Sequence, residues 1–143
     1  MAVGNTNLGN DRGTGTVGAD GFLGPVTGAV NATGTLSGAT VTGITAFAGG
    51  GQGSATALTG IVNSVDTVAT AADSVKLPAP TYAGQMVIVI NTTANACQVF
   101  GSGTDTINAV ATATGVSQAA GKTAMYVATT TGTAAKWWRN LSA

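Results

Sequence analysis

Residues 86–90, Met-Val-Ile-Val-Ile, form the only run of five consecutive large apolar side chains in the chain. Most of these side chains are β-branched, which lowers their preference for a helix and suits them to the pleated surface of a strand. Alternate residues of a strand point to opposite faces, so an unbroken apolar run predicts that both faces are covered. We therefore expect a central strand here, with a layer on each side or within the closed interior of a sandwich.

Shorter apolar stretches before and after this run predict further strands. Turn-forming residues separate them, such as Pro78 and Pro80 in one loop and Gly132 in another. No stretch has the 3.6-residue period and the caps that a helix needs. The predicted strands lie within residues 58–69, 74–77, 96–100, 106–110, 123–129 and 136–141, with a short one at Val116. Short strands with turns about every 8 to 12 residues indicate an all-β fold, either a jelly-roll-like β-sandwich or a barrel.

The first third of the chain has a different pattern, with glycine and small polar residues in place of large apolar ones. Such a segment buries too little apolar surface to offset its ordering entropy by itself. Residues 25–45 repeat an apolar–hydroxyl–glycine pattern, which is typical of solenoid rungs or fibre stalks. We predict an extended Gly/Thr-rich arm or short stalk at 1–48, a Gly-rich linker at 49–53 and a sandwich domain at 54–143. The candidate partner contacts of the arm are Phe22, Leu23, Val26, Val30, Leu36 and Val41.

Charged side chains are scarce. They make up 7% of the chain, against about 25% in an average globular domain. Five basic and five acidic residues balance to a net charge of zero. A neutral chain without a basic cluster lacks the charge that binds nucleic-acid phosphates, and no apolar run approaches the roughly 20 residues that span a bilayer. A surface of Thr, Ser, Ala and Gly favours a protein packed in an assembly, although hydroxyl groups also keep a neutral monomer soluble.

The residue types that catalytic and metal sites need are sparse. Because the chain has no His, neither a Ser–His pair nor a His/Cys zinc site can form. Asp66 and Asp73 flank one predicted strand–turn region and are the best candidates for a carboxylate pair, but turn capping explains them equally well. We interpret the single Cys97 as a small buried hydrophobe. The sequence therefore predicts no enzyme activity, no metal and no cofactor.

Residues 115–123, Gly-Val-Ser-Gln-Ala-Ala-Gly-Lys-Thr, nearly match the phosphate-binding loop. That motif requires four residues between its glycines and a helix after it, because the helix N-terminus holds the phosphates. Here five residues separate the glycines, and a strand pattern follows. We interpret the segment as a hairpin turn.

Trp137 and Trp138 are neighbours, so in a strand they point to opposite faces. The inward ring belongs to the core. The outward ring, next to Lys136 and Arg139, is either an interface anchor, as Trp and Arg often are, or is covered by its own loop. The neighbours Met125 and Tyr126 pose the same question, with core packing favoured. Trp138 and Arg139 join the candidate partner contacts.

Several short motifs between Ile44 and Arg139 resemble a domain of virion structural proteins from tailed bacteriophages, namely head decoration, cement or head-fibre proteins. Together with Leu58 they are ITAFAGGGQ at 44–52, VDTVAT at 65–70, DSVKLP at 73–78, VIVIN at 87–91, VFG at 99–101, DTIN at 105–108 and GKTA at 121–124. The resemblance covers about two thirds of the chain. It implies β-sandwich or jelly-roll domains that form small oligomers on the shell, and it carries over no catalytic residues.

We therefore expect a non-enzymatic virion structural protein that decorates or cements the phage capsid by binding the major capsid protein across subunit boundaries. The expected partners are its own copies, as a homotrimer, and the major capsid protein, without nucleic acid or membrane. The expected location is the outer surface of the capsid, after assembly in the host cytoplasm. Two alternatives stay open: a fibre module that binds a host glycan through Trp138, Tyr126 or Tyr82, and a tail or neck subunit.

Overall fold

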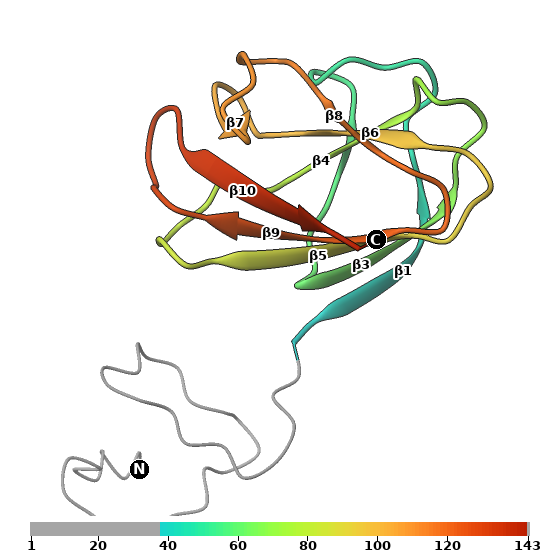
Figure 1. The fold of residues 1–143 in the computed structure, drawn as a ribbon, viewed down its shortest axis with the longest axis horizontal. Helices are drawn as coiled ribbons and strands as arrows, with labels where there is room; N and C mark the ends of the chain where they lie inside the picture. Colours follow the sequence, from blue (N-terminus) through green and yellow to red (C-terminus); the bar gives the residue numbers. More distant parts are fainter. Residues whose placement is uncertain (1–37, 143) are drawn as a thin grey trace, which may run out of the picture. The chain divides into compact units, whose positions relative to one another are not determined.

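The structure, a computed structural model, describes residues 38–142 (Figure 1). This part of the chain contains ten β-strands and no helix, which confirms the all-β prediction. The strands are β1 Thr40–Thr45, β2 Thr56–Ala57, β3 Val62–Thr67, β4 Ser74–Lys76, β5 Met86–Asn91, β6 Cys97–Phe100, β7 Thr106–Ile107, β8 Val116–Gln118, β9 Thr123–Ala128 and β10 Lys136–Leu141.

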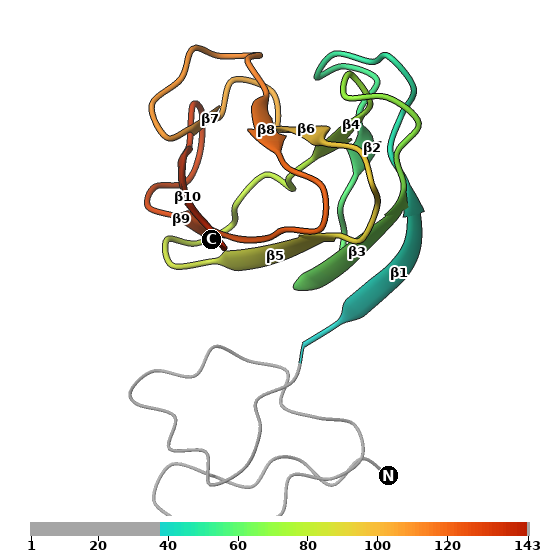
Figure 2. The ribbon, with the colours of Figure 1, turned by 45° about the vertical axis from the view of Figure 1, so that its right-hand side comes forward.

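The strands form two mixed sheets. One has six strands in the order β1-β3-β5-β9-β10-β7, and the other has four in the order β2-β4-β6-β8. From β1 to β6 the chain alternates between the sheets, so that consecutive strands belong to different sheets. It re-enters each sheet in the same direction, and the pairs β1–β3, β3–β5, β2–β4 and β4–β6 are therefore parallel. In Figures 1 and 2 the strands β4, β6 and β8 lie opposite β5 and β9.

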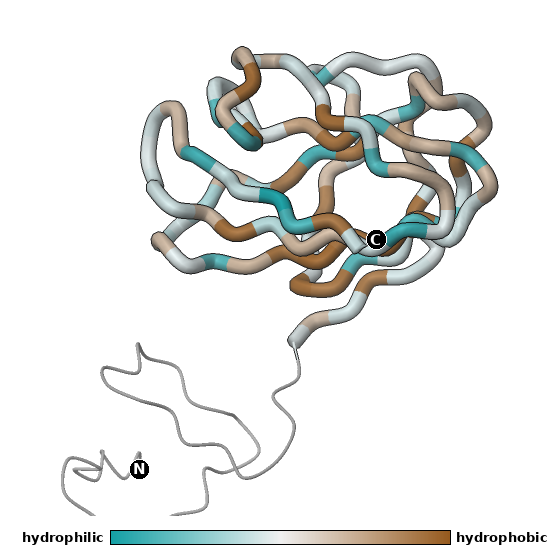
Figure 3. Tube along the Cα trace, viewed as in Figure 1, coloured by the Kyte–Doolittle hydropathy of each residue, from teal (hydrophilic) through white to brown (hydrophobic). Residues whose placement is uncertain are grey.

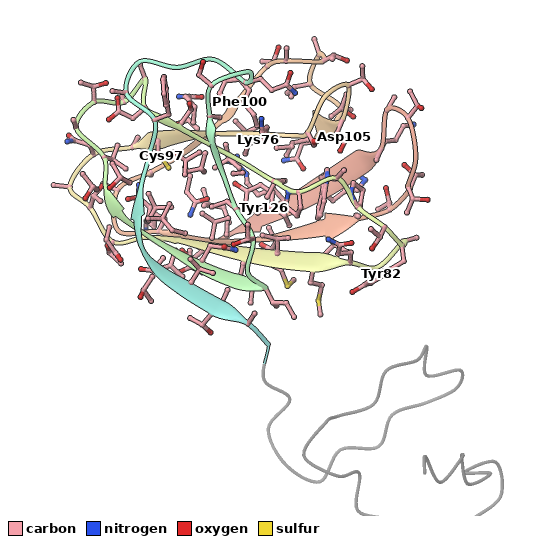
Figure 4. All side chains as sticks on the ribbon, turned by 180° about the vertical axis from the view of Figure 1, so that it is seen from behind. Lys76, Tyr82, Cys97, Phe100, Asp105 and Tyr126 are labelled. Carbon is pink, nitrogen blue, oxygen red and sulfur yellow. The ribbon has the colours of Figure 1, made fainter. Side chains whose placement is uncertain are left out.

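Side chains of both sheets share one hydrophobic core. Its two largest members, Trp137 of β10 and Tyr126 of β9, are 1% and 0% exposed. The two sheets are also joined by a hydrogen bond, in which Nε2 of Gln118 in β8 donates to the carbonyl oxygen of Val89 in β5 at 2.8 Å. Figure 4 shows Tyr126 between the two layers, with Cys97 and Phe100 on the opposite layer.

β5 is an interior strand, but only one of its faces is covered within residues 38–142. Val87 and Val89 are buried, whereas Met86 is 51% exposed and Ile88 and Ile90 are only partly buried. The prediction of a layer on each side of this strand is therefore wrong for the described residues. The four-stranded sheet covers one face of β5. The remaining strands of the six-stranded sheet lie beside β5 and cover neither face.

Part of the segment assigned to the arm and linker belongs to this fold. β1 pairs with β3, and residues 38–142 belong to one compact unit. Gly43 has a φ of 71° and lies where the β1 register shifts by one residue, a conformation that glycine adopts without strain. Beyond this bulge, Ile44 and Ala46 enter the core. The predicted linker is tied by hydrogen bonds from Gly49 N–H to Asp73 and from the Gln52 side chain to Gly101.

Residues 119–122 do connect two strands, as predicted, but they do not form a hairpin turn. β8 belongs to the four-stranded sheet and β9 to the six-stranded sheet, so the segment carries the chain from one sheet to the other. Gly121 has a φ of 65° at this crossing. A strand follows in place of a helix, which agrees with the rejection of a phosphate-binding loop.

Candidate functional site

The outward face of the six-stranded sheet carries an exposed apolar surface. Alternation along β5, β9 and β10 turns one set of residues into the core and the other set away from it. We call the outward apolar set the outer patch; its members are Met86, Ile88, Ile90, Met125, Val127 and Trp138. Figure 3 shows brown, hydrophobic segments along these strands of the sheet. A sheet that faces water usually has polar residues on that side, so this surface is unusual.

Strand register places the members of the outer patch side by side. Met86, Val127 and Trp138 form one row across three strands, because Val127 pairs with both of the others. In the next row Met125 pairs with Ile88 on one side and with Asn140 on the other. Paired residues on one face lie close enough for their side chains to touch. The patch is therefore one continuous surface.

The two tryptophans lie on opposite sides of the sheet. Trp137 is 1% exposed and packs in the core, whereas Trp138 is 57% exposed. The reading in which the outward ring is covered by its own loop is thus wrong for the described residues. Met125 and Tyr126 divide in the same way, since Met125 is 37% exposed and Tyr126 is 0% exposed. Core packing was therefore the right expectation only for Tyr126.

Two of the other predicted partner contacts, Arg139 and Val41, do not share the outward face with Trp138. Arg139 pairs with the buried Tyr126, and its guanidinium Nη1 donates to the carbonyl oxygen of Ser117 at 2.6 Å, so it lies on the inner side. Val41 packs against the core. The remaining candidates of the arm lie outside the described residues: Phe22, Leu23, Val26, Val30 and Leu36.

Two buried polar clusters on the inner side, around Tyr126 and around Asn91, are hydrogen-bonded within the fold. The Tyr126 hydroxyl donates to Oε1 of Gln118 at 3.0 Å. The Asn91 side-chain amide donates to the carbonyl oxygens of Asn95 and Ala119. Burial raises the pKa of Tyr126 above its ordinary value and keeps its phenol neutral. These groups hold the two sheets together and present no reactive atom to solvent.

The three described aspartates serve separate local roles. Asp73 accepts hydrogen bonds from the Thr70 side chain and from the N–H groups of Ala69 and Thr70, which lowers its pKa to about 2. Hydrogen bonds from Ser64, Thr92 and Gly43 lower the pKa of Asp66, which lies on the outward face. They have no hydrogen-bond partner in common. Asp73 caps its turn, as the turn-capping interpretation expected, whereas Asp66 lies within β3 and accepts from Gly43 of the neighbouring strand.

Asp105 differs from the other two, because burial raises its pKa. Its Oδ1 accepts a hydrogen bond from the N–H of Ala135 at 2.9 Å. This bond fixes the loop before β10 against the start of β7. The residue therefore serves to position Trp137, two residues further along.

Residues 38–142 contain no group of three or more His, Cys, Asp or Glu side chains that would hold a metal ion. In the same part of the chain no helix is long and apolar enough to cross a membrane. Cys97 is 0% exposed, and burial raises the pKa of its thiol to about 11. The thiol therefore remains protonated and unreactive at neutral pH.

Sequence reasoning found Trp138 but missed the rest of the outer patch. Met86, Ile88 and Ile90 were assigned to a fully covered strand, and Val127 was not singled out. The signal was present in the unbroken apolar run, which requires apolar residues on both faces of β5. What the run did not specify is which partner covers the second face.

Comparison with known proteins finds no family model that matches this chain, and no curated protein or solved structure that matches it either.

Proposed function

We propose that this chain is a non-enzymatic structural protein of a tailed-phage virion, which decorates or cements the capsid. In this proposal it binds the major capsid protein across subunit boundaries and assembles as a homotrimer on the outer surface of the shell. In this proposal the two mixed sheets form a β-sandwich, although parallel pairs such as β1–β3 and β3–β5 depart from the antiparallel pairing of a jelly roll.

The outer patch is the observation that carries this proposal. An exposed apolar surface of this kind marks a site of association, and Met and Trp are enriched in the centres of interfaces. The sparse charge of the whole chain and the motifs that resemble virion proteins point in the same direction. Many weak contacts of one protein on a repeating shell add up to persistent attachment.

The glycan-binding alternative draws less support from the arrangement of the aromatic residues. A sugar platform requires aromatic rings together with polar groups that bind hydroxyls. Tyr126 is buried and cannot stack on a sugar beside Trp138, which shares its row with the apolar Val127 and Met86 although Lys136 and Asn140 lie beside it on β10. Tyr82 is 62% exposed but belongs to the loop before β5, as Figure 4 shows. A tail or neck location is separated from a capsid location only by experiment.

The test is co-sedimentation of the full-length protein with undecorated capsid shells, titrated to saturation. We expect saturable binding at a fixed ratio of protein to shell subunits. A Phe22→Ser/Leu23→Ser variant tests whether the predicted arm makes the contact, with Phe47→Ser as an exposed control in the described part. Binding to tails or to host polysaccharide in place of shells would overturn the capsid assignment.

A further inference from the structure

The sequence predicts that both faces of β5 are covered, but the described residues cover only one of them. The unbroken apolar run requires cover on both faces, and the described chain covers only the face that carries Val87 and Val89. The uncovered face is the centre of the outer patch. A second layer must therefore come from outside residues 38–142.

The outer patch has the composition of a protein interface. Its apolar centre crosses β5, β9 and β10 and continues to Val62 of β3, which pairs with Ile88, and the other residues around it on the same face are polar. Those are Thr40 on β1, Ser64 and Asp66 on β3, Thr123 on β9, and Lys136 and Asn140 on β10. An apolar centre within a polar rim is the usual anatomy of a contact between two proteins.

The two charged residues of this rim have opposite signs and lie at opposite corners. β3, β5 and β10 run in the same direction, because β3 pairs with β5 in parallel and β9 pairs with both β5 and β10 in antiparallel fashion. Asp66 is near the end of β3, and Lys136 is the first residue of β10. The apolar rows lie between these corners.

We propose that the outer patch binds the same patch of a second copy of this chain. When two such faces meet with their corners exchanged, Lys136 of each copy lies towards Asp66 of the other, and the apolar centres cover each other. A face of uniform charge would repel its own copy, whereas this face is complementary to itself. A face that binds its own copy joins two chains about a two-fold axis, so this contact forms pairs and is separate from any contact that would build the proposed trimer. The inference holds whether or not the chain binds a capsid.

Trp138 is the anchor of this contact. It is the most exposed member of the outer patch and lies at the β10 end of its row, and large aromatic side chains are among those that contribute most to binding. Met86 lies in the same row, one strand beyond Val127. The flexible side chains of Met86 and Met125 adapt their shape to the opposing surface.

The first test is sedimentation velocity of the full-length protein over a range of concentrations. We expect species heavier than the 13.7 kDa chain, and we expect Trp138→Ser to weaken association by at least about tenfold. Met125→Gln, which preserves the shape of the side chain, should weaken it less. Phe47→Ser is the matched control, since Phe47 is 47% exposed but lies outside the patch.

The second test reverses the charges. Lys136→Asp places like charges together and should weaken association, most strongly at low salt. Adding Asp66→Lys to the same chain exchanges the two charges and should restore association. A chain that stays monomeric at all concentrations, or one whose association is unchanged by both Trp138→Ser and Lys136→Asp, would overturn the proposal. So would a Trp138→Ser variant that loses shell binding but still associates, because the patch would then meet the shell.

Discussion

The two faces of the six-stranded sheet are built from the same strands but differ in what they contact. The inner face places Val87, Tyr126 and Trp137 in the core. The outer face, shifted by one residue along each strand, exposes Met86, Met125 and Trp138. Both faces are apolar at their centres, so hydrophobicity alone does not separate core from surface here. The inner face stabilises the fold, and the outer face is available for association.

Replacing each tryptophan by alanine should give the largest difference in stability between the two faces. Trp137→Ala removes a fully buried ring and should lower the free energy of unfolding by about 3–5 kcal/mol. Trp138→Ala should change it by no more than about 0.5 kcal/mol in dilute protein, where association is negligible. Urea denaturation measures both. Equal losses in the two variants would mean that the outer ring is also packed within the monomer.

The two tyrosines compare a buried with an exposed hydroxyl group, and the expected change in stability is smaller than for the tryptophans. Tyr126→Phe removes the hydroxyl that donates to Oε1 of Gln118 and leaves a buried acceptor without its donor. The free energy of unfolding should fall by about 1–3 kcal/mol. Tyr82→Phe, at a position that is 62% exposed, should leave it unchanged. A stable Tyr126→Phe variant would indicate that Gln118 finds another donor.

The aspartates of the two sides should respond to pH with opposite signs. Asp66 has a lowered pKa, so it stabilises the fold above its unfolded pKa, and this contribution is lost as the pH falls through the folded value. Asp105 has a raised pKa, so stability is lost as the pH rises through the folded value. Relative to the unchanged protein, Asp66→Asn should lower the free energy of unfolding most near neutral pH. Asp105→Asn should instead become more stable relative to the unchanged protein as the pH rises from 3 to 6. Urea midpoints across this pH range measure both variants. If the stability of the two variants relative to the unchanged protein changed with pH in the same direction, the roles given to Asp66 and Asp105 would be wrong.

The sulfur-containing side chains should show the smallest energetic effect and the clearest difference in reactivity. Dilute peroxide should oxidise the exposed Met86 and Met125 without unfolding the protein, and should weaken self-association, because the sulfoxide is polar. Cys97, which is fully buried, should not react with a thiol reagent until the chain is denatured. Mass spectrometry of the native and unfolded protein follows both reactions.

The strand positions were predictable because β-strand patterning is local. Residues 136–141 coincide with β10, and residues 86–90 fall within β5. The order of strands was not predictable in this way, since nothing in the residues of β8 and β9 states that they belong to different sheets. That assignment depends on pairings between distant segments, which a single sequence does not display.

The candidate site was predictable only at Trp138. Its neighbour Arg139 has the residue type of an interface anchor, but alternation turns it inward towards Tyr126. Val41 was assigned to an arm, yet the glycine bulge at Gly43 lets β1 join the sheet. The apolar members of β5 were mistaken for core residues because the sequence shows that a face needs cover and not what covers it.

The alternating path of the chain between its sheets has a consequence for how the protein acquires its structure. Within the described residues, β9 and β10 are the only strands that are neighbours both along the chain and within a sheet. Every other pairing closes a loop that passes through the opposite sheet, which slows folding because the entropy of closure is lost before contacts form. β5 meets its antiparallel partner β9 only after the intervening strands β6, β7 and β8 have been synthesised. We therefore expect the long-range pairings to form late in folding, with the β9–β10 hairpin as the earliest local structure.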